Sequence, residues 1–153
     1  LKRTAYLELL GENPPILQHL VDLAGQSEWM VKRLSAYPVL LDELLYPNSL
    51  YEPLQASDLK AELRQSLLRI DEADEEQLLD ALRVFKQSNE LRVAAALLSE
   101  RLSISQVSRY LSQLAEVILQ ASVDICWRLL IQKYGVPDTL DPLNEKQNEK
   151  HLK

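Results

Sequence analysis

The acidic run Asp71–Glu76 is the densest group of potential metal ligands in this sequence, with five carboxylates in six residues. An EF-hand calcium loop requires glycine at its sixth position and glutamate at its twelfth, and this run offers neither. Acidic side chains in the first turn of a helix meet the positive end of the helix dipole. The run therefore predicts the start of a helix near Glu75 rather than a calcium site.

Two aspartates near the C-terminal end, Asp138 and Asp141, come closest to the paired carboxylates that hold Mg²⁺ in nucleotidyl transfer. They follow the last helical pattern, on a segment where nothing positions them in advance. The sequence also contains no glycine-rich phosphate loop, no Gly-x-Ser-x-Gly elbow and no His-Glu-x-x-His pair. We therefore expect no catalytic, cofactor-binding or metal-binding residue in this chain.

Cys126 is the only cysteine, which excludes an internal disulfide and a cysteine-rich metal site. Its neighbours Ile125 and Trp127 are apolar, and neither His19 nor His151 lies near it in sequence. A thiol in such surroundings is more often a small buried hydrophobic group than a nucleophile. The sequence predicts a buried structural Cys126 and fits a reducing compartment.

Three basic residues, Arg3, Lys86 and Arg92, could in principle bind an anion. Solvated or interdomain ion pairs are the more common role of basic residues on helices. The chain as a whole carries a net charge of −6, the wrong sign for neutralising phosphates, so binding to nucleic acid is disfavoured.

The composition indicates an all-α protein, because 33 leucines stand against three glycines and β-branched residues form no runs. No apolar stretch approaches the length of a membrane span, and no signal peptide is evident, so we expect a cytoplasmic chain with no membrane contact. The chain begins without methionine, which indicates a piece of a longer protein.

Short helices punctuated by proline fill the first third of the chain. We expect them over residues 4–10, 14–24, 28–34 and 39–45, with Asn13 and Ser27 as N-terminal caps. Residues 46–53 are predicted to form a loop, in which Tyr46 and Tyr51 either dock a partner or pack inward.

Longer helices follow the loop. A helix beginning at Ser57 or Asp58 has a single apolar row, whereas the helix over residues 75–99 has two and should be packed on two sides. Asn89 falls on one of these rows, and we expect it at the edge of the interface because a buried amide needs hydrogen-bond partners.

The longest predicted helix begins at Ser103 or Ser105 and ends at Tyr134, before a Gly-Val-Pro stop. One apolar row with coiled-coil spacing runs along most of it, and a second appears only in its C-terminal half. The second half should therefore be buried on two sides. The rows consist of Ile104, Val107, Leu111, Leu114, Ile118, Ala121 and Ile125, and of Leu119, Val123, Cys126 and Leu130. We expect one helical bundle over residues 1–137 and a polar, frayed tail over residues 138–153.

Several stretches resemble one family: RTAYLELL (3–10), SEW (27–29), YPVLLDELL (37–45), FKQ (85–87), LRVAA (91–95) and LAE (114–116). Together, over residues 3–137, they are similar to the bifunctional glutamine synthetase adenylyltransferase/adenylyl-removing enzymes. In that family this pattern forms the helical region that leads into the second nucleotidyltransferase domain.

The resemblance implies a parent enzyme that transfers AMP from ATP, with Mg²⁺, to glutamine synthetase and removes it by phosphorolysis under control of PII protein and glutamine. The family's catalytic Gly-Lys-Leu-Gly-Gly and Ser-Asp-Leu-Asp-Leu stretches have no counterpart after Pro137, so no catalytic, metal or ATP residue carries over. The family also has an Asp-His pair ahead of the Leu-Ala-Glu stretch, and this chain has Arg109 and Tyr110 at those two positions.

The resemblance thus implies a non-catalytic segment that joins and couples the two flanking nucleotidyltransferase domains. Two alternatives stay open: a free-standing helical adaptor that binds a partner protein, and a bundle with a glutamine site of its own. The sequence does not distinguish which helix faces touch the flanking domains, whether PII binds this segment, or what its oligomeric state is.

Overall fold

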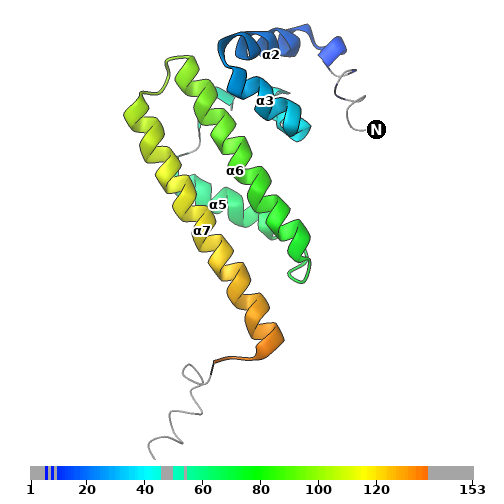
Figure 1. The fold of residues 1–153 in the computed structure, drawn as a ribbon, viewed down its shortest axis with the longest axis vertical. Coiled ribbons are helices and arrows are strands. Elements are labelled where there is room, and N and C mark those ends of the chain that lie inside the picture. Colours follow the sequence, from blue (N-terminus) through cyan, green and yellow to red (C-terminus); the bar gives the residue numbers. More distant parts are fainter. Residues whose placement is uncertain (1–5, 7, 9, 46–49, 54, 138–153) are drawn as a thin grey trace, which may run out of the picture. The chain divides into compact units, whose positions relative to one another are not determined.

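The computed structural model describes residues 6, 8, 10–45, 50–53 and 55–137. These residues form helices and no strand, as the composition predicts. The helices α2, α3, η1, α5, α6 and α7 span Pro14–Gln26, Glu28–Ala36, Pro38–Leu45, Ala56–Leu67, Glu75–Leu98 and Ile104–Tyr134 (Figure 1). The structure is therefore all-α, with boundaries within a few residues of the predicted ones.

Intrachain contacts separate the chain into two compact units, residues 1–117 and 118–153. Helix α7 begins in the first unit and ends in the second. The expected single domain over residues 1–137 remains a prediction, and the expected tail over residues 138–153 lies outside the described residues.

Local signals in the sequence explain where the short helices begin. Two prolines, Pro14 and Pro15, occupy the first turn of α2, where their missing N–H groups cost nothing. The Ser27 hydroxyl accepts a hydrogen bond from the Met30 N–H at 3.4 Å and caps α3. The segment after Pro38 is helical as predicted, but it is a 3₁₀-helix.

The core of the first unit forms where α2, α3 and η1 meet α6. Its fully or nearly fully buried members come from five segments of the chain: Leu23, Met30, Leu34, Leu40, Leu44, Leu50, Leu91 and Ala95. Leu50 and Tyr51 are helical, so the predicted loop is wrong at these two residues. Burial of Leu50 in this core explains the difference, because packing stabilises a short turn that has no helical spacing of its own.

Helix α6 is packed on two sides, as its two apolar rows predict. Leu78, Leu82 and Phe85 on the first row are buried, and Leu91 and Ala95 on the second are fully buried. It contacts both η1 and α5. The chain then reverses into α7 (Figure 1), so α6 is the central helix of the first unit.

The turn between α6 and α7 is a Schellman motif made without glycine. The Arg101 N–H donates to the Ala96 carbonyl at 2.9 Å, and the Glu100 N–H donates to the Leu97 carbonyl at 3.0 Å. This geometry requires a left-handed residue, and Glu100 takes that role with φ 57°. A side chain in this conformation is strained, since glycine adopts it freely.

The rows predicted along α7 are partly wrong. Ile104 is 78% exposed, whereas Tyr110, which lies outside the predicted row, is buried beside the predicted Leu114. Tyr110 takes the packed position of the neighbouring Leu111, which is 39% exposed, and its hydroxyl donates to the buried Asn89, whereas the predicted Leu114 and Ile125 are buried. The helix ends as predicted, with Gly135 at φ 82° donating to the Ile131 carbonyl at 2.8 Å.

Candidate functional site

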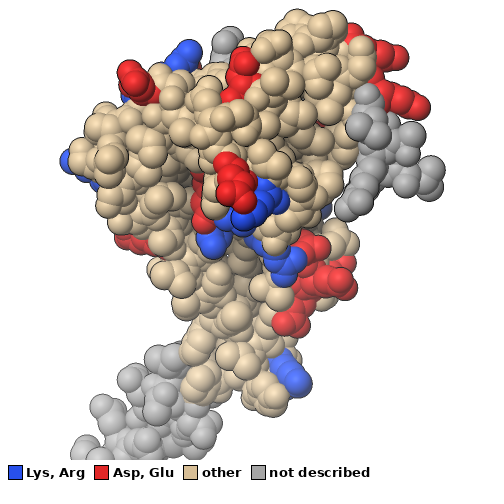
Figure 2. Space-filling model, turned by 45° about the horizontal axis from the view of Figure 1, so that its top comes forward, with Lys and Arg blue, Asp and Glu red and all other residues tan. Residues whose placement is uncertain are grey.

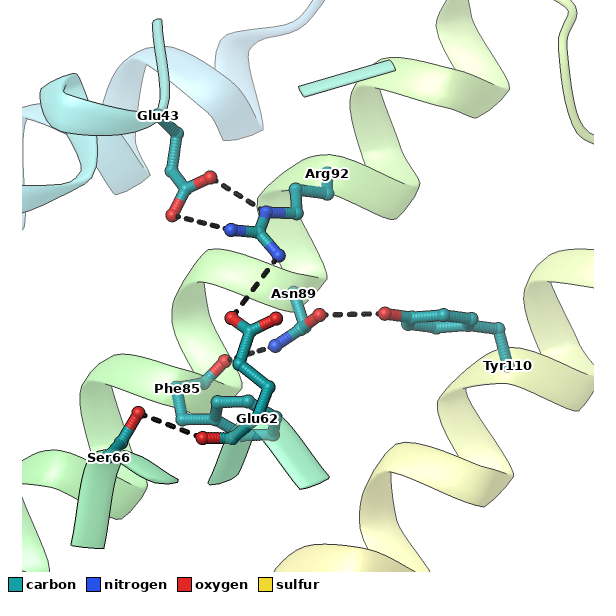
Figure 3. A network of polar contacts seen from close by, with 7 residues as sticks. All are labelled: Glu43, Glu62, Ser66, Phe85, Asn89, Arg92 and Tyr110. Carbon is teal, nitrogen blue, oxygen red and sulfur yellow. Dashed lines mark hydrogen bonds and ion pairs between the residues drawn. The ribbon is translucent and has the colours of Figure 1, made fainter. Parts of the chain in front are cut away.

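Arg92 forms the centre of a polar network between three helices of the first unit. Its Nε and Nη2 donate to the two oxygens of Glu43 on η1, at 2.7 and 3.3 Å, and its Nη1 lies 3.6 Å from Oε1 of Glu62 on α5 (Figure 3). Burial would lower the pKa of Arg92, but the hydrogen bond and charge of Glu43 and the charge of Glu62 outweigh it and raise that pKa. The guanidinium is therefore held charged by its partners.

A second part of the network connects α6 to α7. The Tyr110 hydroxyl donates to Asn89 Oδ1 at 2.7 Å, and Asn89 Nδ2 donates to the Phe85 carbonyl at 2.9 Å (Figure 3). Asn89 is fully buried, so its expected place at the interface edge is wrong. The expectation that a buried amide needs partners is confirmed, because both ends of the amide are hydrogen-bonded.

Glu90 links α6 to α3. Its carboxylate accepts from Arg33 at 2.6 Å and lies 3.5 Å from Lys86 Nζ. The Arg33 guanidinium also lies over the Trp29 ring, 5.0 Å from its centroid, so α3 contributes a cation–π contact beside the ion pair. Residues 89–92 of α6 thus contact η1, α3, α5 and α7 through polar groups.

The basic residues singled out in the sequence serve as ion pairs where the structure describes them. Lys86 pairs with Glu90, and Arg92 pairs with Glu43 and Glu62, so ion pairs form as expected, but they lie within the first unit and the Arg92–Glu43 pair is largely buried. Arg3 lies outside the described residues. Sequence reasoning did not identify the partners, because no spacing along one helix indicates which carboxylate on another helix will face it.

The acidic run forms the beginning of α6, as predicted. Asp74 caps the helix by accepting from the Gln77 N–H at 2.9 Å, and Glu75 and Glu76 occupy its first turn. Among the residues that the structure describes, no three His, Cys, Asp or Glu side chains lie together in a way that could hold a metal. The Mg²⁺ that the resemblance implies for the parent enzyme therefore has no candidate site among these described residues. Asp138, Asp141 and His151 lie outside the described part of the chain.

Cys126 is exposed, so the predicted buried thiol is wrong. It belongs to the second apolar row of α7, and this row is not covered by any described residue. Leu119, Val123 and Leu130 are 65%, 61% and 51% exposed. The prediction that the second half of α7 is buried on two sides is therefore wrong for its second row.

Tyr51 packs inward, which was one of the two interpretations of the predicted loop. Its ring lies edge-on to His19 at a centroid distance of 6.2 Å and under the Arg101 guanidinium at 5.1 Å. Burial and the negative charge of Asp22 raise the pKa of Tyr51, although Arg101 opposes them. Tyr46 lies outside the described residues.

Two surface features do not bring side chains from different elements together into a binding or catalytic site. A shallow hollow beside α5 is lined by Ser57, Lys60, Ala61, Arg64, Gln65 and Leu68. All of these belong to α5 or to the residue directly after it, so no second element brings groups to face them. The face shown in Figure 2 carries acidic and basic side chains side by side, with uncharged areas between them.

Gln87 is an exception to the pairing of buried polar groups. Its side chain is 5% exposed, and Oε1 is buried without a hydrogen-bond partner. It belongs to the Phe85–Gln87 stretch that carries the family resemblance. A buried acceptor without a partner costs stability, so Gln87 lowers the free energy of unfolding of this fold.

The fold and the polar network define an all-α protein whose buried charges tie helices together. The family model of glutamate-ammonia ligase adenylyltransferase matches residues 17–149. Since this match covers most of the 153 residues, the chain belongs to the glutamate-ammonia ligase adenylyltransferase family. Glutamate-ammonia ligase is glutamine synthetase, so the family consists of transferases that modify that enzyme. No described helix has the length and apolar character to cross a bilayer.

Proposed function

We propose that this segment is non-catalytic and that it joins and couples the nucleotidyltransferase domains of an enzyme that adenylylates and de-adenylylates glutamine synthetase. The observation that carries the proposal is the commitment of the Arg92 guanidinium to two other helices. A charge that is held by Glu43 and Glu62 in the interior is not available for a substrate.

The network suits a segment that keeps two domains in a fixed relation. Removing one partner of a buried ion pair typically costs about 3–5 kcal/mol, because it leaves an uncompensated charge. Sliding α6 along η1 would separate Arg92 from Glu43, whose side chains are only 14% and 15% exposed. A displacement of α6 against α7 would break the Asn89–Tyr110 hydrogen bond, so both contacts of α6 resist a gradual shift.

ATP, Mg²⁺, PII protein, glutamine and a cytoplasmic location belong to the proposed parent enzyme. In this proposal ATP and Mg²⁺ bind outside the residues described here, since those residues bring no suitable carboxylates together. The flanking domains of the same chain are the direct partners of this segment, and glutamine synthetase is the substrate of the parent.

The test uses the full-length enzyme that contains this segment. Arg92→Met should reduce the response of both activities to glutamine and PII while leaving each unregulated rate within a few-fold of wild type. Arg83→Met is the matched control, because Arg83 pairs with Asp80 on the exposed face of the same helix. The readouts are the rates of adenylylation and de-adenylylation of glutamine synthetase with and without the effectors.

A second variant distinguishes a loss of coupling from simple unfolding of the segment. Replacing residues 1–137 by a flexible linker of similar reach should abolish effector control altogether. Unchanged responses to both effectors in the linker variant would refute the coupling role. A free-standing adaptor is the alternative that the uncovered row of α7 favours, and it predicts that the gene encodes no nucleotidyltransferase domain after this segment.

A further inference from the structure

The turn between α6 and α7 is built from residues that are also compatible with a helix. The stretch over residues 75–134, which contains both helices and the turn, has no glycine and no proline. Glutamate, arginine and leucine, three of the turn residues, are good helix formers. Glu100 takes φ 57°, a conformation that glycine adopts freely and glutamate adopts only under strain. The chain therefore reverses here against its local preference.

The backbone hydrogen bonds of this turn have helical substitutes. In the turn, the Ala96 carbonyl accepts from the Arg101 N–H at 2.9 Å and from the Leu102 N–H at 3.2 Å. In an uninterrupted helix each N–H donates to the carbonyl four residues before it, so Arg101 would donate to Leu97 and Leu102 to Leu98. Both N–H groups keep a partner when the turn straightens, and the strain at Glu100 is released.

The buried contact between α6 and α7 is almost symmetric about the turn. Asn89 lies 11 residues before Glu100, and Tyr110 lies 10 residues after it. If α6 and α7 became one helix, the two residues of one copy would be about 30 Å apart. Two such helices side by side and antiparallel would bring Asn89 of each copy opposite Tyr110 of the partner subunit. A second copy can therefore replace the hydrogen bond that each chain loses.

We propose that two copies of this chain exchange α7 through the strained turn and form a domain-swapped dimer. Short connections under strain favour such an exchange, and swapped contacts reproduce those of the monomer. The face of α7 involved is the one that carries Tyr110 and already packs on α6, so its partner in the dimer must be the α6 of another copy. The exchanged contacts belong to residues 1–117 of the first unit, and the proposal is independent of the coupling role.

The experiment is sedimentation velocity of the 153-residue chain after refolding from urea at micromolar and at millimolar concentration. Wild type should refold to monomer when dilute and to a mixture of monomer and dimer when concentrated. Glu100→Gly should weaken the dimer by at least about a hundredfold, because it relieves the turn of each monomer and places a poor helix former in each straightened helix.

A second variant should shift the equilibrium in the opposite direction. Ser103 caps the beginning of α7, since its hydroxyl accepts from the Gln106 N–H at 3.4 Å and its N–H donates to Gln106 Oε1 at 2.9 Å. This cap stabilises the hairpin alone, because a straightened helix has no end at Ser103. Ser103→Ala should therefore strengthen the dimer about thirtyfold.

An exchange of α7 also predicts that two different variants complement each other. Asn89→Leu leaves the buried Tyr110 hydroxyl without its acceptor, and Tyr110→Phe leaves the Asn89 amide without its donor. In a swapped dimer with one copy of each, one interface carries the intact Asn89–Tyr110 pair and the other carries leucine opposite phenylalanine. Both unpaired groups disappear, so the mixture should form dimers at least about a hundredfold more tightly than either variant alone.

The matched control is a mixture of Asn89→Leu with Tyr134→Phe, because Tyr134 is 71% exposed on the same helix. This mixture should associate no more tightly than wild type. Association through any other surface would make the two mixtures equal. The proposal is overturned by that equality, by a wild type that refolds only to monomer at millimolar concentration, or by a Glu100→Gly variant that dimerises as strongly as wild type.

Discussion

Replacing Tyr110 by phenylalanine removes the hydroxyl that donates to Asn89 Oδ1 at 2.7 Å. Asn89 is fully buried, so water cannot replace this partner without a rearrangement of α6 and α7. Leaving a buried acceptor unpaired costs about 1–3 kcal/mol. We therefore expect Tyr110→Phe to lower the free energy of unfolding by about 2 kcal/mol and the melting temperature by about 6 °C for a chain of this size.

The double-mutant cycle makes this prediction specific to the hydrogen bond. Asn89→Leu alone should also destabilise, because it removes the acceptor of the buried Tyr110 hydroxyl. The double variant Asn89→Leu/Tyr110→Phe removes both partners, and such a replacement can be nearly neutral. The two changes should therefore be coupled by about 1–3 kcal/mol, with the double variant more stable than the sum of the single effects predicts.

Urea denaturation followed by circular dichroism measures all three variants. Tyr134→Phe is the matched control, since its ring is 71% exposed on the same helix and the change should stay within about 0.5 kcal/mol of wild type. A Tyr110→Phe variant as stable as this control, or strictly additive effects in the cycle, would show that the hydrogen bond does not contribute as argued.

Three other substitutions test single features of the fold. Glu100→Gly should stabilise the chain by about 1 kcal/mol in urea denaturation by relieving the left-handed strain, whereas Ser99→Gly should not; equal effects would contradict the strain argument. Burial raises the pKa of Tyr51 above 10.0, so stability that is present below pH 10 is lost as the pH rises through the raised pKa. The alkaline decline should be shallower in Tyr51→Phe, and parallel pH profiles would refute this. Gln87→Leu should raise the free energy of unfolding by about 1 kcal/mol, because the buried Oε1 of Gln87 has no partner. Thermal unfolding should show no such gain for the control variant Gln65→Leu, whose position is exposed. A lower free energy of unfolding in Gln87→Leu would contradict this argument.

The helices could be predicted because their signals are local. Prolines after Asn13, the Ser27 cap, the acidic start of α6 and the glycine that ends α7 each act within one turn of the chain. The two apolar rows of α6 also predicted correctly that it is packed on two sides. The caps and stops join residues only a few positions apart, and the two-sided packing could be predicted because the spacing of the rows is itself a local property.

The candidate site was less predictable because its contacts join distant residues. Glu43 and Arg92 are separated by 49 positions, and Asn89 and Tyr110 by 21. A polar residue on an apolar row of a helix can lie at the edge of the packed face, or it can be buried with a hydrogen-bond partner. The choice depends on a side chain from another helix, and here Tyr110 made burial of Asn89 possible.

Sequence by itself determined the all-α class, most helix boundaries and the family resemblance, because leucine spacing, caps and motif residues are properties of the local chain. Only the tertiary structure decided which charges meet at Arg92, that Asn89 is buried and that Cys126 is exposed. An apolar row states that a helix face needs a partner, but it does not state whether that partner is present. In the second row of α7, Leu119, Val123 and Leu130 are exposed, so the row is not the core face that its spacing predicted.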